Sequence, residues 1–169
     1  IPADNDKEAA FVSGINVYTA RNLADVVNYF AGSMIETAPL KLVQPANFEN
    51  LLADASYPCD MKYVRGQFIA KRALEIAAAG GHNIILIGPP GSGKTMLAKC
   101  FQTILPPMTF AESMETTKIH SCAGLLDAEH GIVLTRPFRC PHHTASTVSL
   151  AGGGKYARAG EISLAHNGV

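Results

Sequence analysis

The hydrophobic pattern is most regular between residues 67 and 105. A helical period over 67–79 predicts a helix that ends at Gly80-Gly81, and the continuous apolar run over 83–87 predicts a strand covered on both faces of a sheet. A second helical period follows a glycine-rich turn and stops at Pro106-Pro107. Helix, buried strand, tight loop and helix in this order are typical of an α/β nucleotide-binding fold. The expected apolar faces consist of Ile69, Ala73, Ile76 and Ala77 in the first helix and of Met96, Leu97, Cys100, Phe101 and Ile104 in the second.

The first 58 residues carry a weaker pattern. Short helical periods at 5–12 and 22–31 flank a candidate strand at 15–18, and Asn22 fits the capping position of the second helix. Prolines at 39, 45 and 58 then interrupt the pattern. The segment 32–58 is therefore predicted to be a linker with one short helix between residues 45 and 55.

Composition and charge narrow the class of protein. The chain is 47% hydrophobic and 17% charged, and 14 basic residues balance 14 acidic ones, so binding to nucleic acid would need a local basic patch. No apolar run approaches the roughly 18–20 residues of a membrane helix, and the acidic start lacks the pattern of a secretory signal. The four cysteines form no C-x-x-C pair, which favours reduced thiols in a cytoplasmic protein. The first residue, Ile1, indicates a piece of a longer chain.

Residues 88–95, GPPGSGKT, fit the pattern G-x-x-x-x-G-K-[ST] at every position. The glycines permit backbone angles that turn consecutive N–H groups toward an anion, and the following helix adds its positive end. Lys94 supplies a cation for the β- and γ-phosphates, and Thr95 offers a hydroxyl to Mg²⁺. ATP and Mg²⁺ are therefore the predicted ligands. Contacts are expected from Gly88, Pro89, Pro90, Gly91, Ser92, Gly93, Lys94, Thr95 and Met96.

Hydrolysis needs a further acidic residue at the end of a second apolar strand. The segment 124–131 has only two apolar residues before Asp127, too few for a buried strand. In the segment 131–138 the apolar run leads to Thr135 and Arg136 instead of an acid. The sequence therefore predicts no catalytic acid within this chain.

Several blocks together are more specific than the phosphate loop alone. They are VRGQ at 64–67 with the helical segment 68–83, GPPGSGKTMLA at 88–98, RPFRCPHHTAS at 136–146, LAGGG at 150–154 and GEISLAHNGV at 160–169. With these blocks the chain resembles the magnesium-chelatase-like AAA+ ATPases of the ComM/YifB group. It departs from the usual pattern at Tyr63, Cys140 and Ala159, which concern loop geometry and local packing.

The resemblance implies an α/β fold with an incomplete P-loop AAA+ core of three αβα layers in residues 59–169. In such proteins a strand LFLDE follows, so the chain is expected to stop just before the acidic strand. The segment 117–154 is similar to the helix-2 insertion of this clade, and residues 1–31 are similar to the tail of a Lon-protease-type (S5-like) domain, joined by the linker 32–58. The adenine is expected against the segment 64–67, which adds Val64 and Gln67 to the candidate nucleotide-binding residues.

The resemblance also implies a function for the complete protein. It would be a cytoplasmic hexameric ring that couples ATP hydrolysis to DNA branch migration, without a membrane partner, while this fragment would bind nucleotide without efficient hydrolysis. The close alternative is the motor subunit of a magnesium chelatase, which the Lon-like segment 1–31 disfavours. A nucleotide-binding adaptor that never hydrolyses ATP is the third possibility.

The segment after residue 135 leaves two pairs of alternatives. Cys140, His142 and His143, with His120 and Cys122 upstream, suggest zinc, but their spacing lacks the usual ligand pairs and favours an ordinary loop. Arg136 and Arg139 could face DNA beside the two histidines, but a neutral chain favours arginines that fasten the insertion to carbonyls or carboxylates. The glycines 152–154 suggest a flexible pore or partner loop, residues 161–165 a short helix, and His166-Asn167 a cap or turn.

Overall fold

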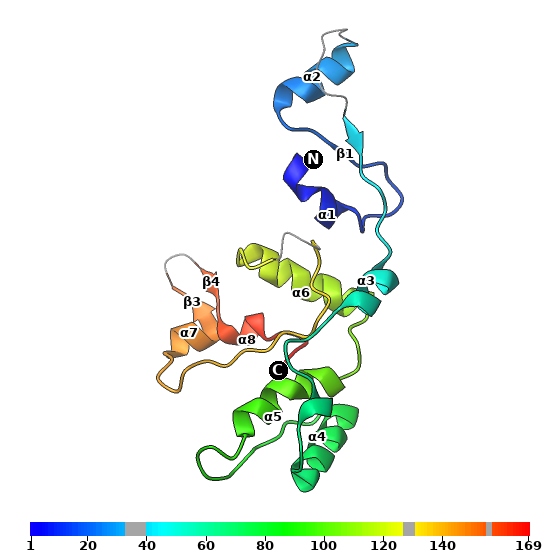
Figure 1. The fold of residues 1–169 in the computed structure, drawn as a ribbon. Helices are drawn as coiled ribbons and strands as arrows, with labels where there is room; N and C mark the ends of the chain where they lie inside the picture. The colour runs from blue at the N-terminus through cyan, green and yellow to red at the C-terminus, as the bar shows by residue number, and fades with distance from the viewer. Residues whose placement is uncertain (33–39, 127–130, 155–156) are drawn as a thin grey trace.

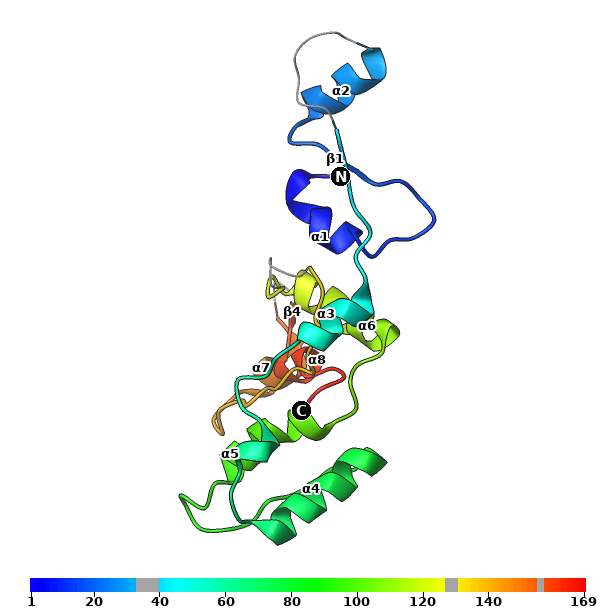
Figure 2. The ribbon, with the colours of Figure 1, turned by 45° about the vertical axis from the view of Figure 1, so that its right-hand side comes forward.

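The computed structural model describes residues 1–32, 40–126, 131–154 and 157–169. Its elements are spread along one long axis, with α1, α2 and β1 at one end and α4 and α5 at the other (Figures 1 and 2). Asp127 and part of the predicted linker, residues 33–39, lie outside the described residues. No helix among the described residues is both long and apolar enough to cross a bilayer.

The N-terminal part contains a two-residue antiparallel strand pair. Strand β1 (Tyr18–Thr19) pairs with β2 (Lys41–Leu42), Tyr18 opposite Leu42 and Thr19 opposite Lys41. The strand was predicted at 15–18, and only Tyr18 of that segment lies in β1. The observed position is where β2 offers backbone groups for hydrogen bonding. The pairing also places β2, from the predicted linker, beside the first 31 residues.

Three short helices in this part follow the hydrophobic pattern. Helix α2 (Leu23–Ala31) confirms the prediction over 22–31, and the Asn22 side chain accepts a hydrogen bond from the Asp25 N–H at 3.0 Å, as expected of the cap. Helix α3 (Phe48–Asp54) is the short helix predicted before residue 55. The predicted helix 5–12 is shorter: a 3₁₀ turn (Ala3–Asn5) leads into α1 (Asp6–Ala9).

The main hydrophobic core lies between α4 (Phe68–Gly80) and α5 (Lys94–Phe101), with the 3₁₀ turn Met61–Tyr63 beside them. Both helices were predicted, and Gly81 ends α4 in a left-handed conformation (φ 62°). Another 3₁₀ turn (Gln102–Ile104) continues α5 toward Pro106. The buried residues of this core are Met61, Val64, Leu74, Ala77, Ala78, Leu97, Cys100 and Phe101.

The predicted apolar faces are partly wrong. In α4 the buried side chains are Leu74, Ala77 and Ala78, whereas Ile69 is 89% exposed. In α5 the buried residues Leu97, Cys100 and Phe101 confirm the prediction, but Met96 is 49% exposed. Helix α4 meets α5 with its Leu74 side, so the side that carries Ile69 and Ile76, predicted to be buried, stays uncovered by the described residues.

The predicted strand 83–87 is wrong as a paired strand: it forms no sheet with any of the described residues, and Ile87 is 88% exposed. The described sheets are two separate antiparallel pairs, β1–β2 and β3–β4. A strand is stable only beside a partner that satisfies its backbone groups, and apolar sequence alone does not supply one. The chain is thus a mixed α/β structure, while the three-layer core stays a prediction.

Helix α6 (Phe110–Cys122) was not predicted. Its start is a capping box: the Thr109 hydroxyl accepts from the Glu112 N–H at 3.3 Å, and the Glu112 carboxylate accepts from the Thr109 N–H at 2.8 Å. The sequence signal is Thr109-x-x-Glu112, which begins two residues after Pro107. Phe110 packs edge-on against Phe48 of α3 at 5.4 Å between ring centres, which joins α6 to the first half of the chain.

Residues 147–154 and 157–164 form a compact unit of two helices and one pair of strands. Helix α7 (Thr147–Ala151) leads into strand β3 (Gly152–Gly153), which pairs with β4 (Arg158–Ala159) before α8 (Glu161–Leu164). Helix α8 confirms the predicted short helix. Of the predicted flexible loop 152–154, Gly152 and Gly153 are paired with β4 as strand β3. The flexibility of this segment and its role as a pore or partner loop stay predictions.

The hairpin explains why position 152 requires glycine. Gly152 has φ +86°, and a Cβ there would lie 2.6 Å from the Gly160 nitrogen and 2.7 Å from the Arg158 oxygen. We expect Gly152→Ala to lower the free energy of unfolding by about 2–3 kcal/mol, through backbone strain and overpacking together. Gly153→Ala, where φ is +109° but nothing lies within 4 Å, should cost about 1 kcal/mol through strain alone. Urea denaturation measures both, and equal losses would contradict the close approach.

Candidate functional site

The glycine-rich loop turns the chain directly into α5. Gly91 and Gly93 have φ values of 77° and 84°, a left-handed region that side chains with a Cβ rarely occupy. Gly93 is the residue before the helix, and its carbonyl accepts from the Leu97 N–H at 2.9 Å as the first bond of α5. The N–H groups of the first helical turn therefore lie at the end of the loop, where the helix dipole favours an anion.

Lys94 folds back over the loop that precedes it. Its Nζ donates to the carbonyls of Gly88 at 2.8 Å and Pro89 at 2.7 Å, and to the Ser92 hydroxyl at 3.3 Å. A Cβ at Gly88 would lie 3.2 Å from the Ser92 hydroxyl oxygen, so the loop closes tightly around this ammonium. Neutral carbonyls bind an ammonium less strongly than ionised phosphate oxygens, and a phosphate can therefore replace them.

The residues predicted to face adenine divide into two groups. Val64 is buried, its N–H donates to the Met61 carbonyl at 3.1 Å, and its carbonyl accepts from the Lys71 Nζ of α4. Its backbone groups are thus used within the protein. Gln67 instead reaches the phosphate loop, where its Nε2 donates to the Ser92 carbonyl at 3.4 Å.

A cavity of about 680 Å³ lies beside α4 and α5 and reaches Lys94 and Thr95 at its edge. Its walls are mainly apolar side chains, which suit a packing partner better than a charged triphosphate. We therefore do not assign this cavity to the phosphates, and place the candidate phosphate site at the loop itself. Its apolar walls include Leu74, Ile84, Leu86, Phe101, Phe138 and Val169.

Two segments at this cavity meet as parallel strands would. The Val169 N–H donates to the Pro137 carbonyl at 2.8 Å, and the Arg139 N–H donates to the Val169 carbonyl at 2.8 Å. In a parallel pair, a residue on one strand bonds to the residues before and after the one opposite it. Val169 bonds in this way to Pro137 and Arg139, so it lies opposite Phe138. The segment 137–139 and the residues near Val169 are thus in parallel register beside the phosphate loop.

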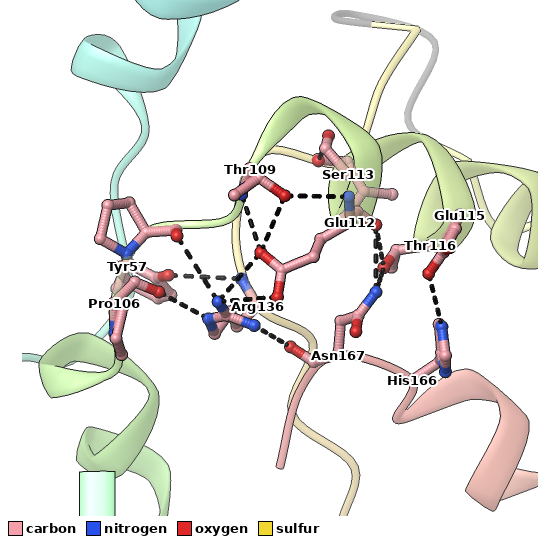
Figure 3. A network of polar contacts seen from close by, with 12 residues as sticks. Tyr57, Pro106, Thr109, Glu112, Ser113, Glu115, Thr116, Arg136, His166 and Asn167 are labelled. Atoms are coloured by element: carbon pink, nitrogen blue, oxygen red, sulfur yellow. Dashed lines mark hydrogen bonds and ion pairs between the residues drawn. The ribbon is translucent and has the colours of Figure 1, made fainter. Parts of the chain in front are cut away.

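Arg136 lies at the centre of the polar network that fixes this register (Figure 3). Its side chain is 12% exposed and donates to the carbonyls of Pro106 at 2.6 Å and Asn167 at 2.8 Å. The same guanidinium lies 3.3 Å from the Glu112 carboxylate. Asn167, which has φ 57° as expected of a turn residue, donates to the Glu112 carbonyl at 3.2 Å. Two predictions, an arginine bonded to carbonyls or a carboxylate and a turn at Asn167, are confirmed. That the segment 117–154 is an insertion stays a prediction.

Arg139 is also engaged. Its Nε and Nη2 donate to the two carboxylate oxygens of Glu161 at 2.6 and 2.8 Å, a bidentate pair that fixes α8. The alternative of a DNA-facing patch built on Arg136 and Arg139 is therefore not supported by their geometry. His142 and His143 lie on the surface with ring centres 4.1 Å apart, and His142 Nδ1 lies 2.7 Å from the Thr144 hydroxyl.

The cysteine prediction can be checked at all four positions. Cys59, Cys100, Cys122 and Cys140 are free thiols, as predicted. Cys100 is buried in the core, where burial raises the pKa of its thiol. Among the described residues no three His, Cys, Asp or Glu side chains converge as a metal site would require.

Two carboxylates in these networks make stability depend on pH. The hydrogen bond from Arg139 lowers the pKa of Glu161, and the Thr109 N–H, then the charge of Arg136, lower the pKa of Glu112. A carboxylate whose pKa is lower in the folded state stabilises the fold above its unfolded pKa, and this contribution is lost as pH falls through the folded pKa.

We expect the protein to lose stability as pH falls below about 4.5, the ordinary pKa of these groups. Glu161→Gln should be less stable than the parent at pH 7 and should lose less on acidification, because its contribution no longer titrates. Urea midpoints at pH 7, 5 and 4 measure this difference. Parallel pH profiles for the parent and the variant would contradict the assignment.

Comparison with known proteins adds independent findings. The family model described as "Magnesium chelatase, subunit ChlI" matches residues 60–169. The chain is 44% identical over 173 residues to the Competence protein ComM of Haemophilus influenzae. It is 40% identical over 169 residues to the proteins named YifB of Escherichia coli and Salmonella typhimurium. Each alignment covers all of this chain and 32% of the relative, so the chain spans about a third of the length of these curated relatives.

Proposed function

Because this chain belongs to the magnesium chelatase ChlI family, within its ComM/YifB group, we propose that it binds MgATP through residues 88–95. One observation carries the proposal: Gly91 and Gly93 bend the loop into the start of α5 while Lys94 is held over the same loop. Backbone donors, a helix N-terminus and a lysine at one place are the requirements of a triphosphate site.

Each part of the loop has a distinct role in this proposal. Lys94 exchanges the carbonyls of Gly88 and Pro89 for β- and γ-phosphate oxygens. Thr95, the second residue of α5, binds Mg²⁺ through its hydroxyl. The backbone N–H groups from Gly91 to Met96 surround the α- and β-phosphates. We assign no hydrolytic acid to the described residues, because none of their acidic residues follows a second apolar strand beside this loop.

For the whole protein we propose an ATPase of the ComM/YifB type, a ring that works in the cytoplasm and uses ATP hydrolysis to move DNA branches. The alignments with ComM and YifB support this over a chelatase motor, because they extend through the first 59 residues, which the family model does not match. The acid for hydrolysis would come from a part of the protein outside the residues described here.

ATP turnover by the intact protein, measured with and without branched DNA, tests this proposal. Branched DNA is expected to accelerate hydrolysis and to be rearranged in an ATP-dependent way. Turnover that responds to a porphyrin and its partner subunits but not to DNA would favour the chelatase motor. Nucleotide binding without any turnover would favour the adaptor.

A further inference from the structure

Gln67 has a backbone conformation that its residue type disfavours. It precedes α4 with φ 53° and ψ 37°, directly after Gly66 with φ 66°. Glycine adopts these angles freely, but glutamine does so at a cost, and it lacks the short side chain that helps Asn in this region. Backbone strain of this kind persists only where the surrounding structure holds the residue in place, and such residues cluster at ligand-binding and active sites.

The side chain of Gln67 reaches into the phosphate loop. Its Nε2 donates to the Ser92 carbonyl at 3.4 Å across 25 residues of sequence. Ser92 in turn receives the Lys94 ammonium on its hydroxyl at 3.3 Å. Gln67 therefore connects the start of α4 to Ser92. Ser92 is one of the three residues that accept hydrogen bonds from the Lys94 ammonium.

The start of α4 is itself firmly held. The Gln67 carbonyl accepts from the Lys71 N–H at 2.9 Å, and the Lys71 ammonium donates to the carbonyl of buried Val64. A hydrogen bond from a fixed residue to a glycine-rich turn restricts the turn more than it restricts the residue. The contact between Gln67 and Ser92 thus limits the conformations available to the loop.

We propose that Gln67 is a positioning residue for the phosphate loop, acting through the Ser92 carbonyl, and that it does not recognise the base. This inference rests on the proposed binding of MgATP at residues 88–95 and adds how that site is held in shape. It predicts that Gln67 matters equally for any ligand that carries the triphosphate, whether or not the ligand has a base.

Binding of MgATP and of Mg²⁺-tripolyphosphate to the intact protein separates the two roles. Gln67→Met keeps the length of the side chain without its donor, and Gln67→Gly removes the side chain together with the strain. Both variants should bind each ligand about fivefold more weakly, the effect of losing one hydrogen bond. Gln67→Gly should unfold at or above the parent's temperature without ligand, so that its weaker binding cannot come from misfolding.

Tyr63→Phe is the matched control, because this exposed residue lies in the same segment and should leave both affinities unchanged. A loss for MgATP alone would overturn the inference, since Gln67 would then contact the base. Unchanged affinity for both ligands would overturn it as well. If the parent protein binds neither ligand, the proposed function itself fails, and the inference fails with it.

Discussion

Lys94→Ala is expected to abolish the stabilisation that MgATP gives to the protein. Ligand at 100 times its Kd should raise the free energy of unfolding of the parent by about 2.7 kcal/mol. The ammonium of Lys94 lies over the carbonyls of Gly88 and Pro89 and is the one loop group that carries a full positive charge. Its removal leaves the negative charge of the β- and γ-phosphates without this compensation.

The measurement is thermal or urea unfolding of the parent and the variant with increasing MgATP. Lys99→Ala is the matched control, because it removes the same charge from the exposed side of the same helix, α5. The control should keep the full stabilisation. Equal stabilisation of the parent and Lys94→Ala would mean that nucleotide binds elsewhere or that the loop contributes nothing.

Arg136→Ala is expected to lower the free energy of unfolding by about 3 kcal/mol. The guanidinium is nearly buried, and its removal leaves the carbonyls of Pro106 and Asn167 without this donor and the carboxylate of Glu112 without its cationic partner. Loss of one member of a buried charged network costs more than the network's net contribution, because the remaining polar groups stay desolvated. The change should also weaken the backbone hydrogen bonds of Val169 with Pro137 and Arg139, because Arg136 holds the carbonyl of Asn167, two residues before Val169.

Urea denaturation at pH 7 measures this loss, and Arg72→Ala is the control. Arg72 pairs with Glu75 on the surface of α4, and its side chain is 72% exposed, so its loss should cost less than about 0.5 kcal/mol. Arg136→Lys should recover little, because one ammonium cannot bond in the several directions that the guanidinium uses. Similar losses for Arg136→Ala and Arg72→Ala would contradict the central position of Arg136.

Local signals in the sequence predicted the local structure well. The amphipathic periods gave α2, α4 and α5, Asn22 and Gly81 act as the expected caps, and α8 lies where predicted. Residues 88–95 match the phosphate-loop motif, and Gly91 and Gly93 have the left-handed backbone angles that its turn was predicted to need, while phosphate binding there stays a proposal. These features depend on residues within one or two helical turns of each other, which a single sequence specifies directly.

The features that failed depend on distant neighbours. The apolar run 83–87 predicts a strand, but pairing needs a partner backbone, and the described residues provide none. The uncovered side of α4 has the same cause, because periodicity indicates an apolar side without naming what covers it. The Arg136 network joins residues from Pro106 to Asn167, a juxtaposition that only the fold reveals. Helix α6, in contrast, has a local signal, because Thr109 and Glu112 form the capping box at its start.

A crystal structure of the intact protein with Mg²⁺ and a non-hydrolysable ATP analogue tests the central claim most directly. We predict the α- and β-phosphates against the backbone N–H groups of residues 91–96, with the Lys94 ammonium moved from the carbonyls of Gly88 and Pro89 onto β- and γ-phosphate oxygens. A nucleotide bound elsewhere, with Lys94 still on those two carbonyls, would contradict it.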